Sequence, residues 1–426
     1  MHVVMLSDFE SSNGAAIAAS RLAQGLCGAG HQVTRIVDGP DRRPHDWSTC
    51  RLTAGYSASF PIRLARRLLP SRALRHSRAR TTSEQRRLMR ELSQLLAKLR
   101  PDVINVHNLL GSLYANWSLN LVKVCCDAAP TAWTLHDMWS FTGRCAYSYD
   151  CRKFVTGCDA TCPTPKESPA LEPKRIAGAW EQRRRLLDAY PNLVAIAPSR
   201  WLAREAEVGS WANHRIEIIP NGLPLDVYRP IDRGLSRRAL GIETESPVLL
   251  TVATDVLDRR KGGSFLIETL RRVSHRPLML VTLGNGMLQI QADGICVKSL
   301  GYVDHERTKA LAYSAADILV HPAPVDNLPN VVVEAIACGT PVVCFPVGGV
   351  PEMVRPGKSG WVAEDVSPAA LARAIDLALV ELSTRDWRSS CRAIAEAEYG
   401  IDLQTGHYVE LFQSLRTDAG TAKTVH

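Results

Sequence analysis

The feature that most constrains the fold is an alternation of short apolar runs with stretches of helical periodicity, which occurs twice along the chain. Strands that alternate with helices are typical of βαβ units, which build parallel sheets. In the first half the pattern predicts a helix at Ala15–Leu26 and strands at His2–Leu6, Gln32–Val37, Val103–His107, Thr131–Leu135 and Leu193–Ala197. In the second half it predicts helices at Phe265–Val273 and Val331–Cys338 and strands at Val248–Ala253, Leu278–Leu283, Ile318–Val320 and Val342–Phe345.

The length of 426 residues indicates two domains, because a single hydrophobic core rarely grows to that size. A turn-rich segment at 220–224, PNGLP, is the expected boundary. We therefore expect an α/β fold with a first Rossmann-like domain at 1–221 and a second at 222–390. A C-terminal helix at 391–416 is expected to pack back on the first domain, and the tail 417–426 is expected to be disordered.

No apolar run approaches the roughly 20 residues that cross a bilayer. The N-terminal MHVVMLSD becomes acidic too early for a signal peptide and is better explained as a first strand. These features predict a cytoplasmic protein. Twelve cysteines in such a chain argue against a disulfide framework.

The most informative stretch is PVDNLPNVVVEAIACGTP at 324–341. Pro329 suits the first turn of a helix, and Gly339 followed by Pro341 suits its end. Between them every side chain from 331 to 338 is apolar except Glu334, so the helix should be buried. A lone buried carboxylate needs a partner, which is either a backbone amide or arginine of the protein or the hydroxyls of a ligand. Asp326, eight residues earlier, favours the ligand.

This stretch resembles the E-x7-E signature of glycosyltransferase family 4, with Asp326 in place of the first Glu. The resemblance implies retaining enzymes of the GT-B fold, in which two Rossmann-like domains bind a nucleotide sugar in the cleft between them. It implies that Asp326 contacts the hydroxyls of the donor sugar and that Glu334 binds the ribose. Asn327, Leu328 and Asn330 are expected in the same donor site.

The segment DVLDRRKGG at 255–263 follows a predicted strand and opens a helix. Backbone amides at a helix start and cationic side chains together bind diphosphates, although a basic solvated loop is the plainer alternative. In family 4 an Arg and a Lys-Gly hold the pyrophosphate, and Lys261 matches that lysine. Val256 stands where the arginine is usual, so Arg259 or Arg260 must substitute. Lys261 would stabilise the departing phosphate, and no catalytic metal is required.

Two glycine loops and two histidines complete the expected cleft. Gly14 begins the first helix, and the resemblance places it beside the phosphates; Gly348-Gly349 is similar to a family loop. His107 and the pair His136-Asp137 end predicted strands, at the edge that lines the ligand crevice of parallel sheets. The resemblance implies that His136 reaches the donor sugar. We expect His107 and Asp137 in the acceptor site, with a structural histidine as the alternative.

Four cysteines that follow His136 lie within one stretch of 18 residues. Cys145, Cys151, Cys158 and Cys162 are separated by five, six and three residues, which suits a tetrahedral thiolate site. The stretch HDMWSFTGRC at 136–145 with three later cysteines is similar to glycosyltransferases of the colanic-acid type, which build bacterial exopolysaccharides. We expect a structural zinc ion here, with free buried thiols or an iron–sulfur cluster as alternatives.

The positive charge is concentrated in one segment. Residues 62–100 contain eleven Arg and one Lys against two Glu, a net charge of +10, whereas the whole chain carries +8. Such a patch selects an anionic partner. No aromatic residues interleave with the arginines, which argues against nucleic acid. Leucines do, so docking on an anionic membrane surface is favoured over a solvated helix.

The sequence therefore predicts a retaining glycosyltransferase that moves a sugar from a UDP- or GDP-sugar to a lipid-linked saccharide in surface polysaccharide biosynthesis. It would be cytoplasmic and peripheral at the inner face of the membrane. The alternatives are a sugar-nucleotide epimerase of the GT-B fold, a catalytically inactive scaffold and a basic nucleic-acid-binding protein.

Overall fold

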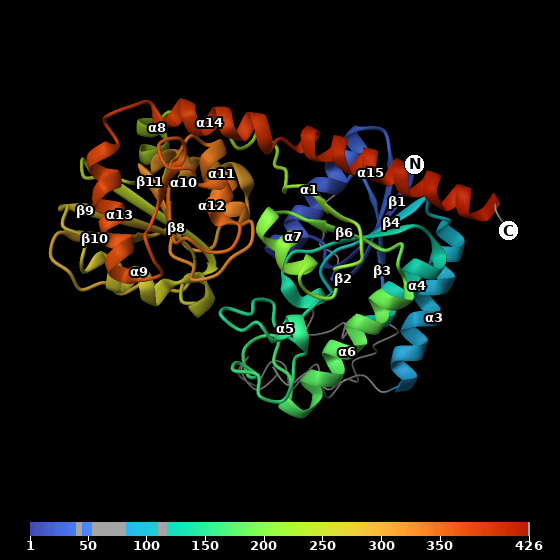
Figure 1. The fold of residues 1–426 in the computed structure, drawn as a ribbon. Helices are drawn as coiled ribbons and strands as arrows, with labels where there is room; N and C mark the ends of the chain where they lie inside the picture. Colours follow the sequence, from blue (N-terminus) through green and yellow to red (C-terminus); the bar gives the residue numbers. More distant parts are fainter. Residues whose placement is uncertain (40–44, 53–81, 110–116, 425–426) are drawn as a thin grey trace, which may run out of the picture. The chain divides into compact units, whose positions relative to one another are not determined.

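The computed structural model describes residues 1–39, 45–52, 82–109 and 117–424, and the chain divides into two compact units. The first unit comprises 1–197, 203–218 and 405–426, and the second comprises 198–202 and 219–404. Each unit is an α/β domain in which a parallel sheet lies between helices (Figure 1).

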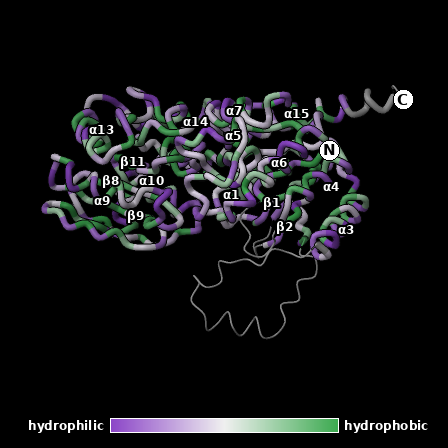
Figure 2. The backbone as a smooth tube through the Cα atoms, turned by 60° about the horizontal axis from the view of Figure 1, so that its bottom comes forward, coloured by the Kyte–Doolittle hydropathy of each residue, from purple (hydrophilic) through white to green (hydrophobic). Residues whose placement is uncertain are grey.

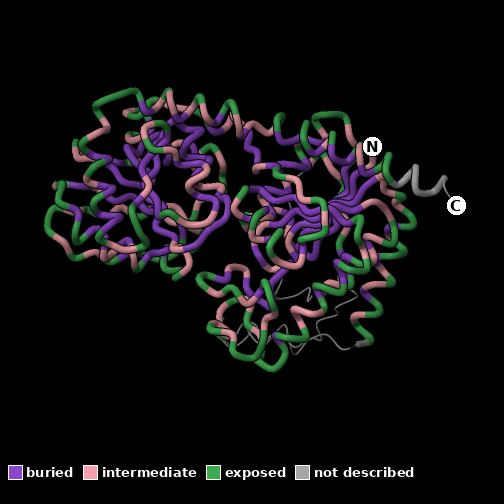
Figure 3. Tube along the Cα trace, viewed as in Figure 1, coloured by how far each residue is buried: buried purple, intermediate pink, exposed green. Residues whose placement is uncertain are grey.

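The first unit contains a seven-stranded sheet in the order β3-β2-β1-β4-β5-β6-β7, in which every neighbouring pair is parallel. The order of its first six strands is that of the Rossmann fold. Residues 3–6 of the central β1 are wholly buried because both faces of the sheet are covered (Figure 3). The strands are β1 His2–Phe9, β2 Gln32–Gly39, β3 Ser48–Arg51, β4 Val103–Val106, β5 Thr131–Thr134, β6 Val194–Ala197 and β7 Ile216–Ile218.

The helices of the first unit bury an apolar face and expose a polar one, and the two kinds of residue alternate along them in Figure 2. In α3, Leu88, Leu92 and Leu96 recur every four residues and are buried, whereas Arg86 and Arg90 are exposed. Among the described residues before the second sheet, the helices are α1 Gly14–Gly28, α3 Thr82–Leu99, α4 Asn120–Ala128, η2 Met138–Ser140, α5 Lys153–Thr156, α6 Pro173–Ala189 and α7 Arg200–Glu207, of which α7 belongs to this unit from Ala203 onward.

The second unit repeats the Rossmann order in a six-stranded parallel sheet, β10-β9-β8-β11-β12-β13. Its strands are β8 Val248–Asp255, β9 Leu278–Asn285, β10 Ile295–Ser299, β11 Ile318–His321, β12 Val342–Cys344 and β13 Gly360–Val362. Its helices are α8 Arg233–Ala239, η3 Arg259–Lys261, α9 Gly263–Leu270, α10 Glu306–Ala315, α11 Asn330–Ala337, α12 Val350–Met353, α13 Pro368–Glu381 and α14 Trp387–Glu398.

Alternate residues of the central strand β8 belong to different cores. Val248 and Leu250 join a cluster with α10, α11 and α14, whereas Leu249 joins a cluster with α9 and α13. Successive side chains of a strand point to opposite faces, so the sheet is buried on both sides. This explains why β8 begins with consecutive apolar residues instead of alternating apolar and polar ones.

The C-terminal helix crosses from the second unit to the first. Helix α15 spans Ile401–Thr424, and from Thr405 onward it belongs to the first unit, where Tyr408 Oη lies 3.1 Å from Thr134 Oγ1 and Phe412 is buried. The expected single helix 391–416 is two helices, α14 and α15. The expected disorder after 416 is wrong as far as Thr424, because α15 continues to that residue.

The chain passes between the units at Ile218 and Ile219, three residues before the expected boundary. A second difference is that the segment 198–202 belongs to the second unit. Ser199 Oγ donates to Asn327 Oδ1 at 2.6 Å, and the Glu352 carboxylate accepts from the Trp201 amide at 2.7 Å. These polar contacts attach the segment, and no sequence pattern indicated them.

Within the ranges that the structure describes, no helix combines the length and apolar character needed to cross a membrane.

Candidate active site

The strand order of each sheet marks where a ligand can bind. In the strand order 3-2-1-4, the loop after strand 1 and the loop after strand 4 lead to opposite faces of the sheet. This leaves a crevice at the carboxyl ends of these two strands. In the second unit these loops follow β8 and β11. The first carries Lys261 and the second carries Asp326, so two expected site residues lie on either side of this crevice.

Lys261 and Asp326 form an ion pair at this point. Lys261 Nζ donates to Asp326 Oδ2 at 2.7 Å, and His321 Nε2 lies 3.6 Å from the same oxygen. The Asp326 side chain is 7% exposed and that of Lys261 is 24% exposed. Burial alone would raise the pKa of the Asp326 carboxyl, but Lys261, His321 and Arg260 together hold it well below its usual range. Asp326 is therefore an anion at neutral pH.

Two glycines allow the lysine loop to pack closely against neighbouring backbone, at the residue after β11 and at the loop after β8. Gly262 has a left-handed φ of 81°, and a Cβ there would lie 1.9 Å from Pro322 O. A Cβ on Gly263 would lie 2.1 Å from Val256 O. Only glycine fits both positions without moving the backbone. The KGG sequence therefore brings Lys261 to the end of β11, where Asp326 follows.

Glu334 is buried in α11, as the sequence predicts, and its exposed fraction is 4%. Tyr313 of α10 donates its hydroxyl to Glu334 Oε2 at 2.8 Å. Burial, and then the nearby Glu334 carboxylate, raise the pKa of Tyr313 well above its usual value, so the hydroxyl keeps its proton. The carboxylate thus has a partner within the protein, and sequence reasoning missed Tyr313 because it lies 21 residues away with no motif around it.

The other residues that the sequence places in the nucleotide-sugar site lie at or just before α11, and their side chains make different contacts. Leu328 is 7% exposed and belongs to the hydrophobic core, so its side chain is structural. The buried Asn327 carboxamide accepts from Ser199 Oγ at 2.6 Å. Asn330, the first residue of α11, accepts from Asn221 Nδ2 at 3.3 Å. The pattern of a buried apolar helix and the loop before it could not separate packing from binding at these positions.

The structure distinguishes the two candidate arginines. Arg259 is exposed, whereas Arg260 is half-buried and close enough to Asp326 to help lower the pKa of that carboxyl. Gly348 also approaches this point, since a Cβ there would lie 1.8 Å from Asp326 O. Arg260 and the glycine loop are therefore neighbours of the Lys261–Asp326 pair.

In the first unit, the two expected histidines are in direct contact. His107 Nδ1 lies 3.0 Å from His136 Nε2. Burial lowers the pKa of His136 to about 4, and burial and His136 lower the pKa of His107 well below its usual value. Both rings are therefore neutral at physiological pH. In the contact between them, one ring nitrogen donates its N–H and the other accepts it. His107 is 2% exposed and its Nε2 has no hydrogen-bond partner among the described residues.

Asp137 and Gly14 lie near the carboxyl ends of β5 and β1. Asp137 accepts from the Trp139 amide at 2.8 Å and caps the short helix η2. One of its oxygens thus has a structural role beside any contact with an acceptor. Gly14 begins α1 after the Asn13 cap, and a Cβ there would meet no protein atom within 4 Å. Neither its φ nor its protein packing requires glycine at this position.

The four clustered cysteines line one small cavity in the first unit, together with Thr142, Arg144 and Phe154. The sequence spacing therefore brings these four side chains together. As the side chains stand, no three His, Cys, Asp or Glu residues of the described ranges are placed to hold a metal ion.

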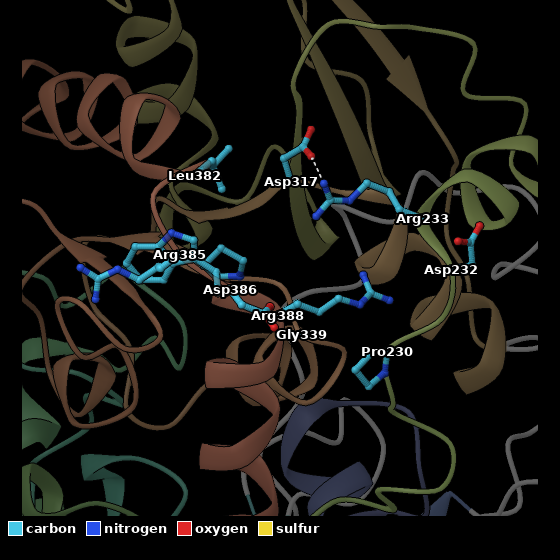
Figure 4. A pocket seen from close by; sticks show the side chains of 11 residues that line it. Pro230, Asp232, Arg233, Asp317, Gly339, Leu382, Arg385, Asp386 and Arg388 are labelled. Atoms are coloured by element: carbon cyan, nitrogen blue, oxygen red, sulfur yellow. Dashed lines mark ion pairs between the residues drawn. The ribbon is translucent and has the colours of Figure 1, made fainter.

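A cavity of about 630 Å³ lies in the second unit, away from the Lys261–Asp326 pair (Figure 4). Part of its wall comes from Asp317, Gly339 and Pro341, which precede β11 and β12 at the edge opposite to the crevice. The rest comes from residues within 230–233 and 382–388. Arg233, Arg385 and Arg388 face it, as do Asp232, Asp317 and Asp386, and Arg233 pairs with Asp317 at 2.8 Å. These six charges balance, so the cavity shows no preference for an ion of either sign.

The similarity to solved structures defines the fold class of this protein. The fold is that of GT-B glycosyltransferases. The sucrose-phosphate synthase of Thermosynechococcus elongatus has a TM-score of 0.68 and 21% identity, covering 97% of this chain and 99% of that one. HepE of Anabaena, solved in complex with UDP-glucose, has a TM-score of 0.66 and 17% identity, covering 97% and 100%.

The family follows from the sequence models. Residues 12–227 match the model described as Glycosyltransferase Family 4, and residues 246–380 match Glycosyl transferases group 1. The chain belongs to glycosyltransferase family 4 and is a transferase.

Two curated relatives support this assignment. The colanic acid biosynthesis glycosyltransferase WcaC of Escherichia coli K12 is 26% identical over 66% of this chain and 68% of its own length. A D-inositol 3-phosphate glycosyltransferase of Catenulispora acidiphila is 31% identical over 50% of this chain, and the match spans only 53% of that enzyme.

Proposed function

We propose that this glycosyltransferase retains the anomeric configuration and moves a sugar from a UDP- or GDP-sugar to a lipid-linked saccharide of a surface polysaccharide. The observation that carries the proposal is the Lys261–Asp326 pair at the carboxyl edge of the second sheet, with Glu334 on the helix that follows Asp326. The similarity to WcaC favours exopolysaccharide synthesis. The complex of HepE with UDP-glucose favours a uridine nucleotide sugar.

The proposed chemistry follows from the charges of this site. When the bond between the sugar C1 and the phosphate oxygen breaks, negative charge grows on the diphosphate. Lys261 and Arg260 stabilise that charge, as do backbone amides at the start of α9. Asp326 is an anion and accepts hydrogen bonds from sugar hydroxyls, and Glu334 accepts them from the ribose. Both carboxylates therefore bind hydroxyl groups and leave the phosphates to the cations.

The experiment that tests this proposal incubates the purified protein with UDP- and GDP-sugars. We expect one nucleotide class to raise the melting temperature and to be hydrolysed slowly without an acceptor. Conversion of the donor to an epimer with no release of nucleoside diphosphate would instead identify an epimerase. Absence of any shift or turnover with the whole panel would indicate an inactive scaffold and would contradict the proposal.

The lipid-linked acceptor is proposed together with docking on an anionic membrane at the inner face of the cell membrane. The arginines from 63 to 80 lie outside the described residues. In the described part, helix α3 buries Leu88, Leu92 and Leu96 and exposes Arg86, Arg87 and Arg90. This helix therefore offers charge to a membrane but no apolar face, so docking through it would be electrostatic.

We accordingly expect salt-sensitive binding to vesicles that contain anionic lipid, because each basic side chain near such a surface contributes about 1 kcal/mol before screening. Cosedimentation should fall as the salt concentration rises. Replacing Arg86, Arg87 and Arg90 by Gln should weaken binding, whereas replacing the exposed Arg373 of the second unit should not. Equal binding to neutral and anionic vesicles would rule out the electrostatic mechanism.

A further inference from the structure

The connection between β5 and α6, residues 135–172, contains only two short helical elements, η2 and α5. Parts of it are nevertheless deeply buried, including Phe141, Thr142 and Phe154. Fixing the backbone of each residue costs roughly 1–2 kcal/mol of conformational entropy. A long connection without regular hydrogen bonding therefore needs strong tertiary constraints to keep one conformation.

Four cysteines of this connection line one cavity. Cys145, Cys151, Cys158 and Cys162 reach it from different turns of the chain, and Phe154 and Ile176 form part of its wall. The Gly143 amide donates to Cys158 Sγ at 3.2 Å. A backbone N–H directed at a cysteine sulfur favours the thiolate over the thiol. Burial nevertheless raises the pKa of the Cys145 thiol to about 11 and raises that of Cys158 above its usual value, so both sulfurs carry protons that metal binding would have to displace.

Cationic side chains surround the same cavity. Arg144 and Lys153 line it, and the buried Arg183 is close enough to Cys145 and Cys158 to interact with their charge. The charge of Lys153 is already paired with Asp159, which also lines the cavity, at 2.8 Å. Arg144 also donates to Glu167 O at 2.9 Å, and Arg183 donates to Trp139 O at 2.7 Å. A zinc ion with four thiolates carries a net charge of −2, which the two arginines would offset.

We propose that Cys145, Cys151, Cys158 and Cys162 bind one structural zinc ion, which fixes the connection that follows His136 and Asp137. The proposal is independent of the proposed glycosyl transfer. On binding, each thiol releases its proton to solvent and forms a sulfur–zinc bond, and zinc stays divalent, so no oxidant is needed. Because no three of these side chains are now placed around one point, the sulfurs must rotate inward to about 2.3 Å from the ion.

The test is metal analysis of the full chain purified without chelator. We expect about one zinc per chain, and we expect Cys151→Ser to lose it. The matched control is Cys296→Ser, because Cys296 is exposed on β10 of the second unit. Replacement of zinc by cobalt should produce thiolate-to-cobalt charge-transfer absorption in the wild type and the control but not in Cys151→Ser. This readout does not depend on enzymatic activity.

Several results would overturn the proposal. The first is a metal-free protein whose four cysteines all react with a thiol reagent in the native state. The second is a mass that reveals disulfides between these cysteines. The third is iron with acid-labile sulfide in place of zinc. If Cys151→Ser does not fold, chelation of the wild type decides the question, since zinc removal should lower its melting temperature and re-addition should restore it.

Discussion

Replacing Lys261 by alanine is expected to lower turnover by about 10²–10³-fold, the usual cost of removing one preorganised group that stabilises transition-state charge. Lys261 Nζ lies 2.7 Å from Asp326 Oδ2, and its loop follows β8 at the crevice of the second sheet. Without the ammonium group, the departing diphosphate loses a neutralising cation. The pKa of Asp326 should also rise, because the first of the cations that lower it is gone.

The measurement is the rate of nucleoside diphosphate release at saturating donor, with thermal unfolding to establish that the variant is folded. Lys261→Arg keeps the charge and should retain more activity than Lys261→Ala. The matched control is Lys358→Ala, since Lys358 is an exposed lysine of the same unit. Near-normal turnover of folded Lys261→Ala would place the phosphate site elsewhere.

Glu334→Gln is expected to weaken binding of the free nucleoside diphosphate by about 10- to 100-fold, because hydrogen bonds to charged groups contribute about 1.5–3 kcal/mol. Glutamine keeps the size of the side chain and one acceptor oxygen but removes the charge. The substitution therefore probes the proposed ribose contact with little change in the packing of α11.

Calorimetry with UDP and with GDP measures this effect. Tyr313→Phe is the informative control, because it removes the hydroxyl that donates to Glu334 Oε2 and leaves the carboxylate in place. We expect this control to lower the melting temperature more than the nucleotide affinity. If Glu334→Gln folds and binds both nucleotides with unchanged affinity, Glu334 is a structural carboxylate satisfied by Tyr313.

The central strands of both sheets were predictable from the sequence, whereas all four edge strands were not. Strands such as β1 and β8 are covered on both faces, so each contains consecutive apolar residues without alternation, at 3–6 and 248–250. The edge strands β3, β7, β10 and β13 are three to five residues long, and β3, β7 and β10 have no buried residue. Their pairing depends on a neighbouring strand that local periodicity does not reveal.

The sequence by itself identified Glu334, Lys261 and Asp326 as candidates. A lone charge on an apolar helix, an acid eight residues before it, and a lysine followed by two glycines after a strand are all local signals. That these residues bind the donor stays a prediction. Only the tertiary structure decided that Lys261 meets Asp326, 65 positions later, and that His107 contacts His136. It also decided that Tyr313 donates to Glu334 and that Leu328 belongs to the core. The physical reason is that these hydrogen bonds join residues far apart in the sequence. Strand order and close backbone packing at glycines bring such residues to within about 3 Å of each other, and local sequence does not encode either.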